Sequence, residues 1–165
     1  MDIHDRIIGK STRSEIHKNN LLHRSIHILV FNFKGQIFLQ KRSMSKDENP
    51  GLWDISCAGH VNSGESYDEC ANRELREELG IKAALNPLTK IEACNETYHE
   101  HVQVYFCKTG ETIKINQAES SEGKYLDFRT LKNETQKKPD QFTLSLKLIL
   151  KKYTEKIIKD AQILL

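Results

Sequence analysis

Short runs of apolar and β-branched residues, separated by turn-forming residues, recur along the chain and predict β-strands. The first two runs flank a short turn, FKGQ, and therefore predict a β-hairpin. A polar, basic loop that ends at Pro50 and Gly51 separates this hairpin from the next strand. The predicted strands cover residues 25–32, 37–41, 52–58, 88–98, 99–108 and 123–128.

The clearest predicted helix covers about residues 65–79. Ser66 and Glu69 have the spacing of a capping box, in which each side chain accepts a hydrogen bond from the other residue's backbone N–H. Gly80 follows as a natural C-terminal stop. The apolar residues of this segment recur at helical spacing, at Cys70, Ala71, Leu75 and Leu79. We therefore expect one face of the helix to pack on a core.

A longer amphipathic pattern covers the end of the chain and predicts a helix over about residues 141–163, after a polar connector and a short helix over residues 129–134. Its apolar positions are Phe142, Leu146, Ile149, Tyr153, Ile157, Ala161 and Leu164. The order of strands, helix, strands and helix predicts a mixed α/β (α+β) fold rather than a regular βαβ series. The length suffices for one core, so we expect a single domain over residues 1–165.

The charge balance and the cysteine spacing exclude some classes of protein. The formal net charge is +2, which gives no basis for a large nucleic-acid-binding surface. No apolar run is long enough to span a bilayer, and the first segment, MDIHDRIIGK, is too charged for a secretory signal. The cysteines, which form no CxxC pair, are Cys57, Cys70, Cys94 and Cys107. We therefore expect a cytoplasmic protein with reduced, mostly buried thiols, and neither nucleic acid nor membrane as a partner.

Three carboxylates crowd one face of the first predicted helix. Glu74, Glu77 and Glu78 are spaced i, i+3 and i+4, so they fall within an arc of roughly 100°. Like charges at this spacing repel one another and destabilise a helix. On a helix that also packs on a core, such a cluster needs a cation. The pattern therefore predicts a site for Mg²⁺ or Mn²⁺, hard ions that prefer carboxylate and carbonyl oxygens.

Arg73 and Glu65 flank this cluster. The planar guanidinium of Arg73 could bind the Glu65 carboxylate and so tie the preceding loop to the helix. That link would fix the backbone near Gly59, where a carbonyl group could join the metal shell.

The whole segment from Gly59 to Ile81 matches the Nudix box, GX5EX7REUXEEXGU with U an aliphatic residue, at every specified position. The chain therefore resembles the Nudix family. The resemblance implies the Nudix fold, an αβα sandwich around a mixed β-sheet. It also implies that the protein uses Mg²⁺ or Mn²⁺ to hydrolyse a diphosphate linkage in a nucleotide or a related small metabolite.

The resemblance also implies roles for residues of the box. Glu77 and Glu78 would be the main metal ligands, and Glu74 would be a further ligand or the base for the attacking water. The backbone carbonyl near Ala58 and Gly59 would complete the metal shell. The residues with structural roles would be Glu65, Arg73 and Gly80.

A further carboxylate is expected from a later loop. Residues 117–128, QAESSEGKYLDF, place Glu119 and Glu122 shortly before Tyr125. This arrangement resembles the E-x-x-E-aromatic pattern that follows the box in Nudix relatives. It favours Glu122 as a catalytic carboxylate, with Glu119 second; the alternative is a solvated loop.

Residues 20–107 also resemble isopentenyl-diphosphate isomerases, which share the Nudix fold but shift a double bond. Those enzymes carry a reactive cysteine directly before a Gly-His pair, where this chain has Ala58. Cys57 lies one residue earlier, and neighbouring residues of a strand point to opposite faces. The isomerases also carry two glutamates on a later strand, where this chain keeps Glu100 but has Val102. These losses and the intact box favour hydrolysis, with isomerisation as the alternative.

Other residues at isomerase-like positions are candidates for binding. His23 and His60 occupy positions at which the isomerases bind metal, and Glu100 could accompany them in a second metal position; the alternative is structural histidines. Arg42 and Lys46 match positions that grip the substrate diphosphate, and their charge suits phosphate. The alternative for these two is an ordinary exposed loop.

Several questions stay open at the level of sequence. Trp53 and Tyr67 could stack on a base, but buried packing is favoured for both. A catalytically silent binding module is a third hypothesis, and the intact carboxylates argue against it. The diphosphate substrate and the oligomeric state are not specified.

Overall fold

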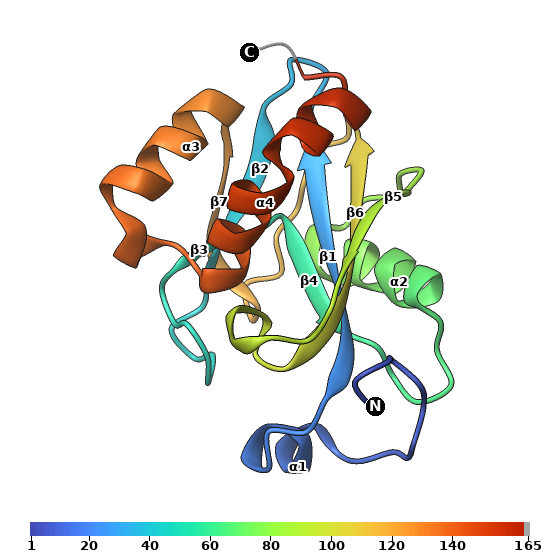
Figure 1. The fold of residues 1–165 in the computed structure, drawn as a ribbon. Helices are drawn as coiled ribbons and strands as arrows, with labels where there is room; N and C mark the ends of the chain where they lie inside the picture. The colour runs from blue at the N-terminus through green and yellow to red at the C-terminus, as the bar shows by residue number, and fades with distance from the viewer. Residues whose placement is uncertain (164–165) are drawn as a thin grey trace.

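A mixed seven-stranded β-sheet forms the centre of the protein (Figure 1). The computed structural model describes residues 1–163. The strands are β1 (His23–Phe31), β2 (Ile37–Arg42), β3 (Trp53–Asp54), β4 (Cys57–His60), β5 (Asn86–Ile91), β6 (Glu100–Lys108) and β7 (Ser120–Leu126). Their order is β3-β2-β1-β6-β5, with β4 paired to β1 and β7 paired to β2.

Strand β1 organises the sheet. It pairs in parallel with β6 along its whole length, from His23 opposite Glu100 to Phe31 opposite Lys108. On its other edge, β4 pairs antiparallel with residues 25–28, whereas β2 joins only at the far end of the strand, opposite Phe31. The sheet therefore forks between β2 and β4.

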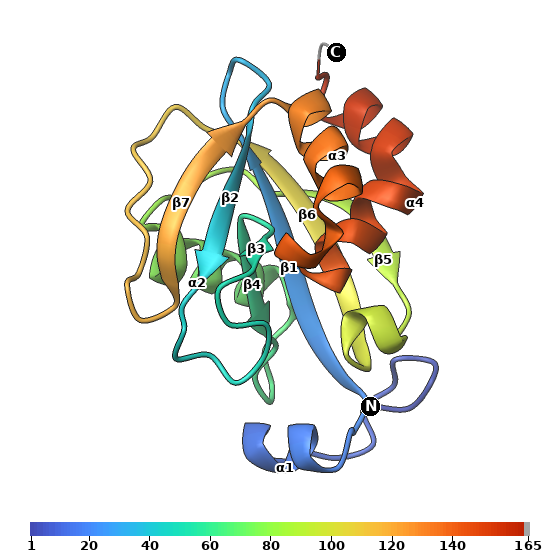
Figure 2. The ribbon, with the colours of Figure 1, turned by 90° about the vertical axis from the view of Figure 1, so that its left-hand side faces the viewer.

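Helices cover both faces of the sheet (Figure 2). Helix α2 (Tyr67–Leu79) lies on one face, and α3 (Phe128–Lys137) and α4 (Leu144–Asp160) lie on the other. This arrangement confirms the predicted αβα sandwich around a mixed sheet.

The side chains of β1 alternate between the two cores. Ile26, Ile28 and Val30 are buried together with the apolar residues of α2. Leu29 and Phe31 belong to the core under α3 and α4. Because successive side chains of a strand point to opposite faces, the apolar stretch of β1 is buried on both sides.

The ends of α2 are fixed by the expected capping groups. The Ser66 side chain accepts a hydrogen bond from the Glu69 N–H, and the Glu69 carboxylate accepts one from the Ser66 N–H at 2.8 Å. Gly80 has a left-handed backbone with φ of 67°, which an L side chain rarely adopts. The helix begins at Tyr67, two positions later than predicted.

The strand predicted over residues 52–58 is interrupted and forms β3 and β4. The Ser56 hydroxyl donates to the Phe38 carbonyl at 2.6 Å and accepts from the Val30 N–H at 2.8 Å. A side chain thus takes the place of ladder hydrogen bonds at this position, and the chain turns from β2 towards β1.

Other boundaries also differ from the pattern. The sequence predicts a strand over residues 88–98, but β5 ends at Ile91, and a 3₁₀-helix follows over Asn95–Thr97. The C-terminal helix α4 is shorter than predicted and follows a 3₁₀-helix over Pro139–Gln141. Leu164 lies outside the described residues. The polar helix α1 (Arg13–Lys18) has no buried residue, so no amphipathic pattern indicated it.

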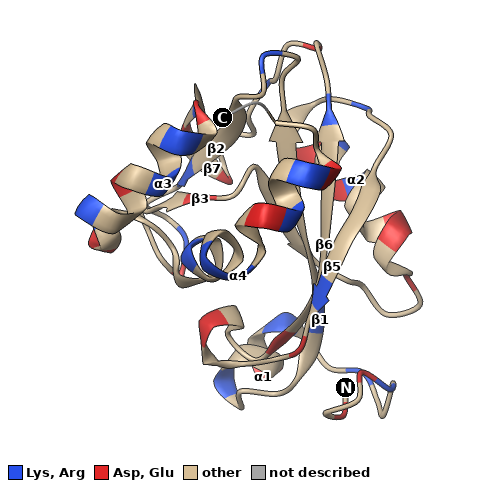
Figure 3. Ribbon diagram, turned by 45° about the horizontal axis from the view of Figure 1, so that its top comes forward, with Lys and Arg blue, Asp and Glu red and all other residues tan. Residues whose placement is uncertain are grey.

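Basic and acidic residues are interspersed on α3 and α4 in the view of Figure 3. Within residues 1–163, no helix combines the length and the apolar character that crossing a bilayer requires.

Packing of α2 on the sheet can be tested with a leucine pair. Leu75→Ala should lower the free energy of unfolding by about 2–5 kcal/mol, because Leu75 is buried under the helix and its removal leaves a cavity. The same change at Leu144, which is 44% exposed, should cost less than about 0.5 kcal/mol. Urea titration of both variants measures the difference, and equal losses would contradict this account of the core.

Candidate active site

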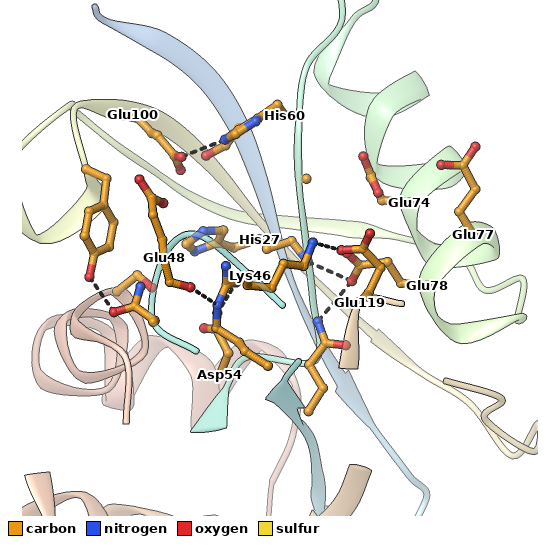
Figure 4. Close-up of a pocket in the computed structure, with 18 of the residues that line it drawn as sticks. His27, Lys46, Glu48, Asp54, His60, Glu74, Glu77, Glu78, Glu100 and Glu119 are labelled. Atoms are coloured by element: carbon orange, nitrogen blue, oxygen red, sulfur yellow. Dashed lines mark hydrogen bonds and ion pairs between the residues drawn. The ribbon is translucent and has the colours of Figure 1, made fainter. Parts of the chain in front are cut away.

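A polar cavity of about 350 Å³ lies beside the fork in the sheet (Figure 4). Side chains from β1, β2, β4, α2 and β6 line it, together with loop residues before β3 and β7. In the view of Figure 4, Glu74, Glu77 and Glu78 lie at one side of the cavity, and Glu48 and Glu100 lie at the other.

Glu78 is the most buried carboxylate of α2 that lines the cavity. It is 7% exposed, and its Oε2 accepts hydrogen bonds from Gln40 Nε2 at 3.0 Å and from the Ala58 N–H at 3.4 Å. Burial raises the pKa of Glu78 to about 7, against the opposing effect of the Gln40 hydrogen bond. Without a cation, this carboxylate is therefore costly to ionise.

Glu74 passes over the backbone of Gly59. A Cβ atom on Gly59 would lie 2.1 Å from the Glu74 carboxyl carbon, which is far closer than real contacts allow. A side chain at this position would therefore displace the Glu74 carboxylate from its place in the cavity. Burial also raises the pKa of Glu74.

Arg73 joins the box loop to the carboxylates of the helix. Its Nε lies 2.8 Å from Glu65 Oε1, and its Nη2 donates to the His60 carbonyl at 3.2 Å. Its Nη1 lies 2.6 Å from Glu74 Oε1 and 3.2 Å from Glu77 Oε2. One guanidinium thus fixes the loop and offsets part of the negative charge of the cluster.

Lys46 and Arg42 also line the cavity. Lys46 Nζ forms an ion pair with the Glu119 carboxylate. Arg42 Nη1 lies 3.1 Å from Asp54 Oδ2, and its Nε donates to the Glu48 carbonyl at 2.9 Å. The polar loop between β2 and β3 is therefore held against the site by its own basic residues.

The later loop contributes Glu119 and not Glu122 to the cavity. Glu119 lines the cavity, whereas Glu122 pairs with Lys41 in the β2–β7 ladder and its side chain is 56% exposed. The structure thus places Glu119, and not the Glu122 that the sequence favours, where a carboxylate could serve the site. A strand that begins at Ser120, earlier than predicted, turns Glu122 away from the site.

Three histidines meet around Glu100. Glu100 Oε1 lies 3.0 Å from His60 Nε2 and 3.3 Å from His23 Nε2. Ligand atoms of His17, His23 and His60 lie within 4.8 Å of one another. Burial acts to raise the pKa of Glu100, but the neighbouring imidazoles of His23 and His60 lower it well below its ordinary value.

The residues at the isomerase cysteine position point in different directions. Ala58 lines the cavity, whereas Cys57 is fully buried in the core under α2. Burial raises the pKa of the Cys57 thiol well above its ordinary value. Val102 follows two positions after Glu100 on β6 and belongs to the apolar core. The cavity thus receives neither a thiol from Cys57 nor an acid from Val102.

A family model described as the NUDIX domain matches residues 21–147. The chain belongs to the Nudix family. Isopentenyl-diphosphate Delta-isomerase 2 of Photorhabdus laumondii is 33% identical to it over 155 residues, which cover 91% of this chain and 88% of the relative. An uncharacterized Nudix hydrolase of Pseudomonas aeruginosa is 42% identical over 85 residues, which cover 52% of this chain and 50% of the relative.

A solved Nudix-fold neighbour covers most of the chain. The crystal structure of a Deinococcus radiodurans protein aligns with a TM-score of 0.73 and 27% identity, over 83% of this chain and 86% of that one. In the present Nudix protein, the box begins at the end of β4, continues through the loop that Arg73 fixes, and ends just after α2.

Among the residues that the sequence did not indicate are Ser25, His27 and Gln40 in the cavity and His17 beside His23 and His60. His17 lies in a polar helix that carries no apolar pattern. Ser25 and His27 follow His23 at alternate positions of β1 and all three are buried, so this period of two was the available signal. Gln40 is a buried polar residue within an apolar strand. Trp53 and Tyr67 do not line the cavity.

The raised pKa of Glu78 predicts a pH dependence of stability in metal-free protein. Unfolded Glu78 releases its proton near pH 4.5 and the buried residue near 7, so the folded state binds the extra proton between these values. The free energy of unfolding should therefore fall as pH rises through this window, by up to about 3 kcal/mol from this residue.

Urea titrations with a chelator, from pH 4.5 to 7.5, measure this fall in the wild type and in Glu78→Gln. Other groups titrate in both proteins, so the difference between the two curves isolates Glu78. Curves that stay parallel across the window would contradict the assignment.

Proposed function

We propose that the protein is a divalent-metal-dependent Nudix hydrolase that cleaves a diphosphate linkage in a small molecule. The observation that carries the proposal is the group of four carboxylates at one side of the cavity, Glu74, Glu77, Glu78 and Glu119. The basic residues Arg42 and Lys46 line the same cavity, and their charge suits phosphate. The proposal includes a nucleotide or a related small metabolite as the substrate and a cytoplasmic location.

The donor set fits Mg²⁺ or Mn²⁺. It consists of carboxylate oxygens together with the backbone carbonyls near Ala58 and Gly59, which are hard ligands. The missing Cβ of Gly59 leaves room for Glu74, and a cation would favour ionisation of the buried Glu78. Glu77 and Glu78 would hold the metal, with Glu74 as a further ligand or as the base.

The protein groups have separate tasks in this mechanism. When bound, the metal would neutralise phosphate oxygens and lower the pKa of a water. Arg73 holds Glu74 and Glu77 in place, and Gln40 orients Glu78. Arg42 and Lys46 would bind the diphosphate, and Glu119 would hold the metal or the attacking water.

We also propose a second metal position at His23, His60 and Glu100, to which the structure adds His17. Three imidazoles and one carboxylate make a donor set that suits transition metals such as Mn²⁺ better than Mg²⁺. The buried and unpaired Nε2 of His17 supports this proposal, since such an atom is costly without a partner.

Isomerisation of isopentenyl diphosphate is the second candidate function. The names of relatives such as the Photorhabdus laumondii protein favour it. Ala58 at the cysteine position and Val102 at the second glutamate position argue against it, because neither can transfer a proton.

The proposal is tested with a panel of nucleoside diphosphates and triphosphates, sugar nucleotides, dinucleotide cofactors and isopentenyl diphosphate. Phosphate release is measured with Mg²⁺ or Mn²⁺, and the products are analysed for dimethylallyl diphosphate. Glu77→Gln should lower kcat/KM for the best substrate about 100-fold or more, because it removes a metal ligand. The Glu77 side chain is 57% exposed, so folding should not suffer.

Glu111→Gln, at an exposed residue outside the cavity, is the matched control and should retain activity. An isomerised product without phosphate release, lost in Cys57→Ala, would overturn the hydrolase proposal. Full turnover by Glu77→Gln would overturn the metal site.

The late carboxylate is tested by a second pair of variants. Glu119→Gln should lower kcat/KM by about tenfold or more, because its carboxylate faces the site. Glu122→Gln should stay within about twofold, since Glu122 points away from the cavity. The opposite order would restore the assignment made from the sequence.

A further inference from the structure

Two buried polar side chains on β1 line the cavity, and each has a buried atom without a partner in the described part of the chain. Ser25 is 2% exposed and His27 is 5% exposed, and both line the cavity. Ser25 Oγ and His27 Nδ1 have no hydrogen-bond partner among residues 1–163. Buried polar atoms are nearly always paired, and an unpaired one destabilises the fold. Two such atoms two residues apart, on the same face of one strand, therefore point to a ligand.

These two residues do not belong to the carboxylate cluster. His27 lies opposite Ala58 on β4 and beside Val104 on β6. Figure 4 shows it between Glu48 and the carboxylates of α2. The small side chain of Ala58 leaves space in the part of the cavity that Ser25 and His27 line, which we call the cavity floor. The cavity thus extends from the carboxylates of α2 to His27, and a group attached to a diphosphate would have room beside His27.

The wall beyond His27 is polar. Asp54, Asn49 and Tyr98 line it, and the Tyr98 hydroxyl donates to Asn49 Oδ1 at 3.0 Å. Tyr98 and Asn49 both have left-handed backbones, with φ of 55° and 50°, which costs free energy for residues other than glycine. Such strain is typical of residues held in position at a ligand site.

We propose that Ser25 and His27 are specificity-determining residues that hydrogen-bond the group attached to the diphosphate, and that this group is a hydroxyl-bearing or nitrogen-bearing moiety such as a sugar or nucleoside. The inference rests on the proposed function. A neutral imidazole offers one donor and one acceptor, and a hydroxyl offers both. A hydrocarbon chain would leave these atoms unpaired, so the floor selects against an isoprenoid group.

The test compares two non-hydrolysable probes by calorimetry in Mn²⁺: methylenediphosphonate, and α,β-methylene-ADP, which adds a nucleoside. The wild type should bind α,β-methylene-ADP at least about tenfold more tightly. His27→Leu should remove this difference and leave methylenediphosphonate within about twofold, and His27→Gln should restore part of it. Equal affinity of the wild type for both probes would overturn the inference alone. If neither probe binds the wild type, both the inference and the proposed function are overturned.

Stability provides a second readout that separates a binding role from a structural one. In ligand-free protein, His27→Leu removes an unpaired buried atom, so the midpoint of thermal unfolding should rise by about 2 °C or more. His101→Leu is the matched control on the neighbouring strand. His101 is equally buried, but its Nε2 lies 2.9 Å from the Asp2 carbonyl and its Nδ1 accepts from the Ala93 N–H. This control should lower the midpoint and keep the preference for α,β-methylene-ADP. The proposal would be overturned if His27→Leu lowers the midpoint of thermal unfolding and weakens the affinity for both probes by the same factor.

Discussion

The apolar face of α2 must be buried, and this requirement holds two carboxylates inside the cavity. Glu74 and Glu78 each come one residue before a core leucine, Leu75 or Leu79. Because consecutive helical residues are about 100° apart, packing the leucines fixes the direction of the carboxylates. Hydrogen bonds then hold both carboxylates in place, Glu74 with Arg73 and Glu78 with Gln40. The hydrophobic effect therefore supplies the free energy that concentrates negative charge at the site.

That concentration of charge is only partly compensated by protein groups. Arg73 contacts Glu74 and Glu77 but not Glu78, whose protein partners are the uncharged Gln40 amide and a backbone N–H. In the proposed function, Glu78 is therefore the residue whose ionisation would gain most from a cation. The fold bears the repulsion among the carboxylates, and the proposed cation would relieve it.

The sequence predicts those parts of this arrangement that depend on local spacing. The αβα layers, the helix with its capping box, and the carboxylates of the box all follow from periodicity or from the Nudix motif. The sequence could not predict the choice between Glu119 and Glu122, because it depends on where β7 begins. His17 and His27 were missed because each meets its neighbours only through tertiary packing. In β1, polar residues recur with a period of two at His23, Ser25 and His27, within a strand that is apolar from Ile28 onwards.

The proposed hydrolysis and the alternative isomerisation require different residues of β4 and β6 to face the cavity. Alternation along β4 puts Ala58 in the cavity and Cys57 in the core, so a thiol one position away cannot substitute for one in place. On β6, the same rule puts Val102 on the face of Glu100, where it adds an apolar surface and no acid. The floor then retains Ser25 and His27 as groups that could interact with a ligand. The residues at these positions of β4 and β6 therefore favour the proposed hydrolysis over isomerisation, which would need groups that transfer a proton to a hydrocarbon.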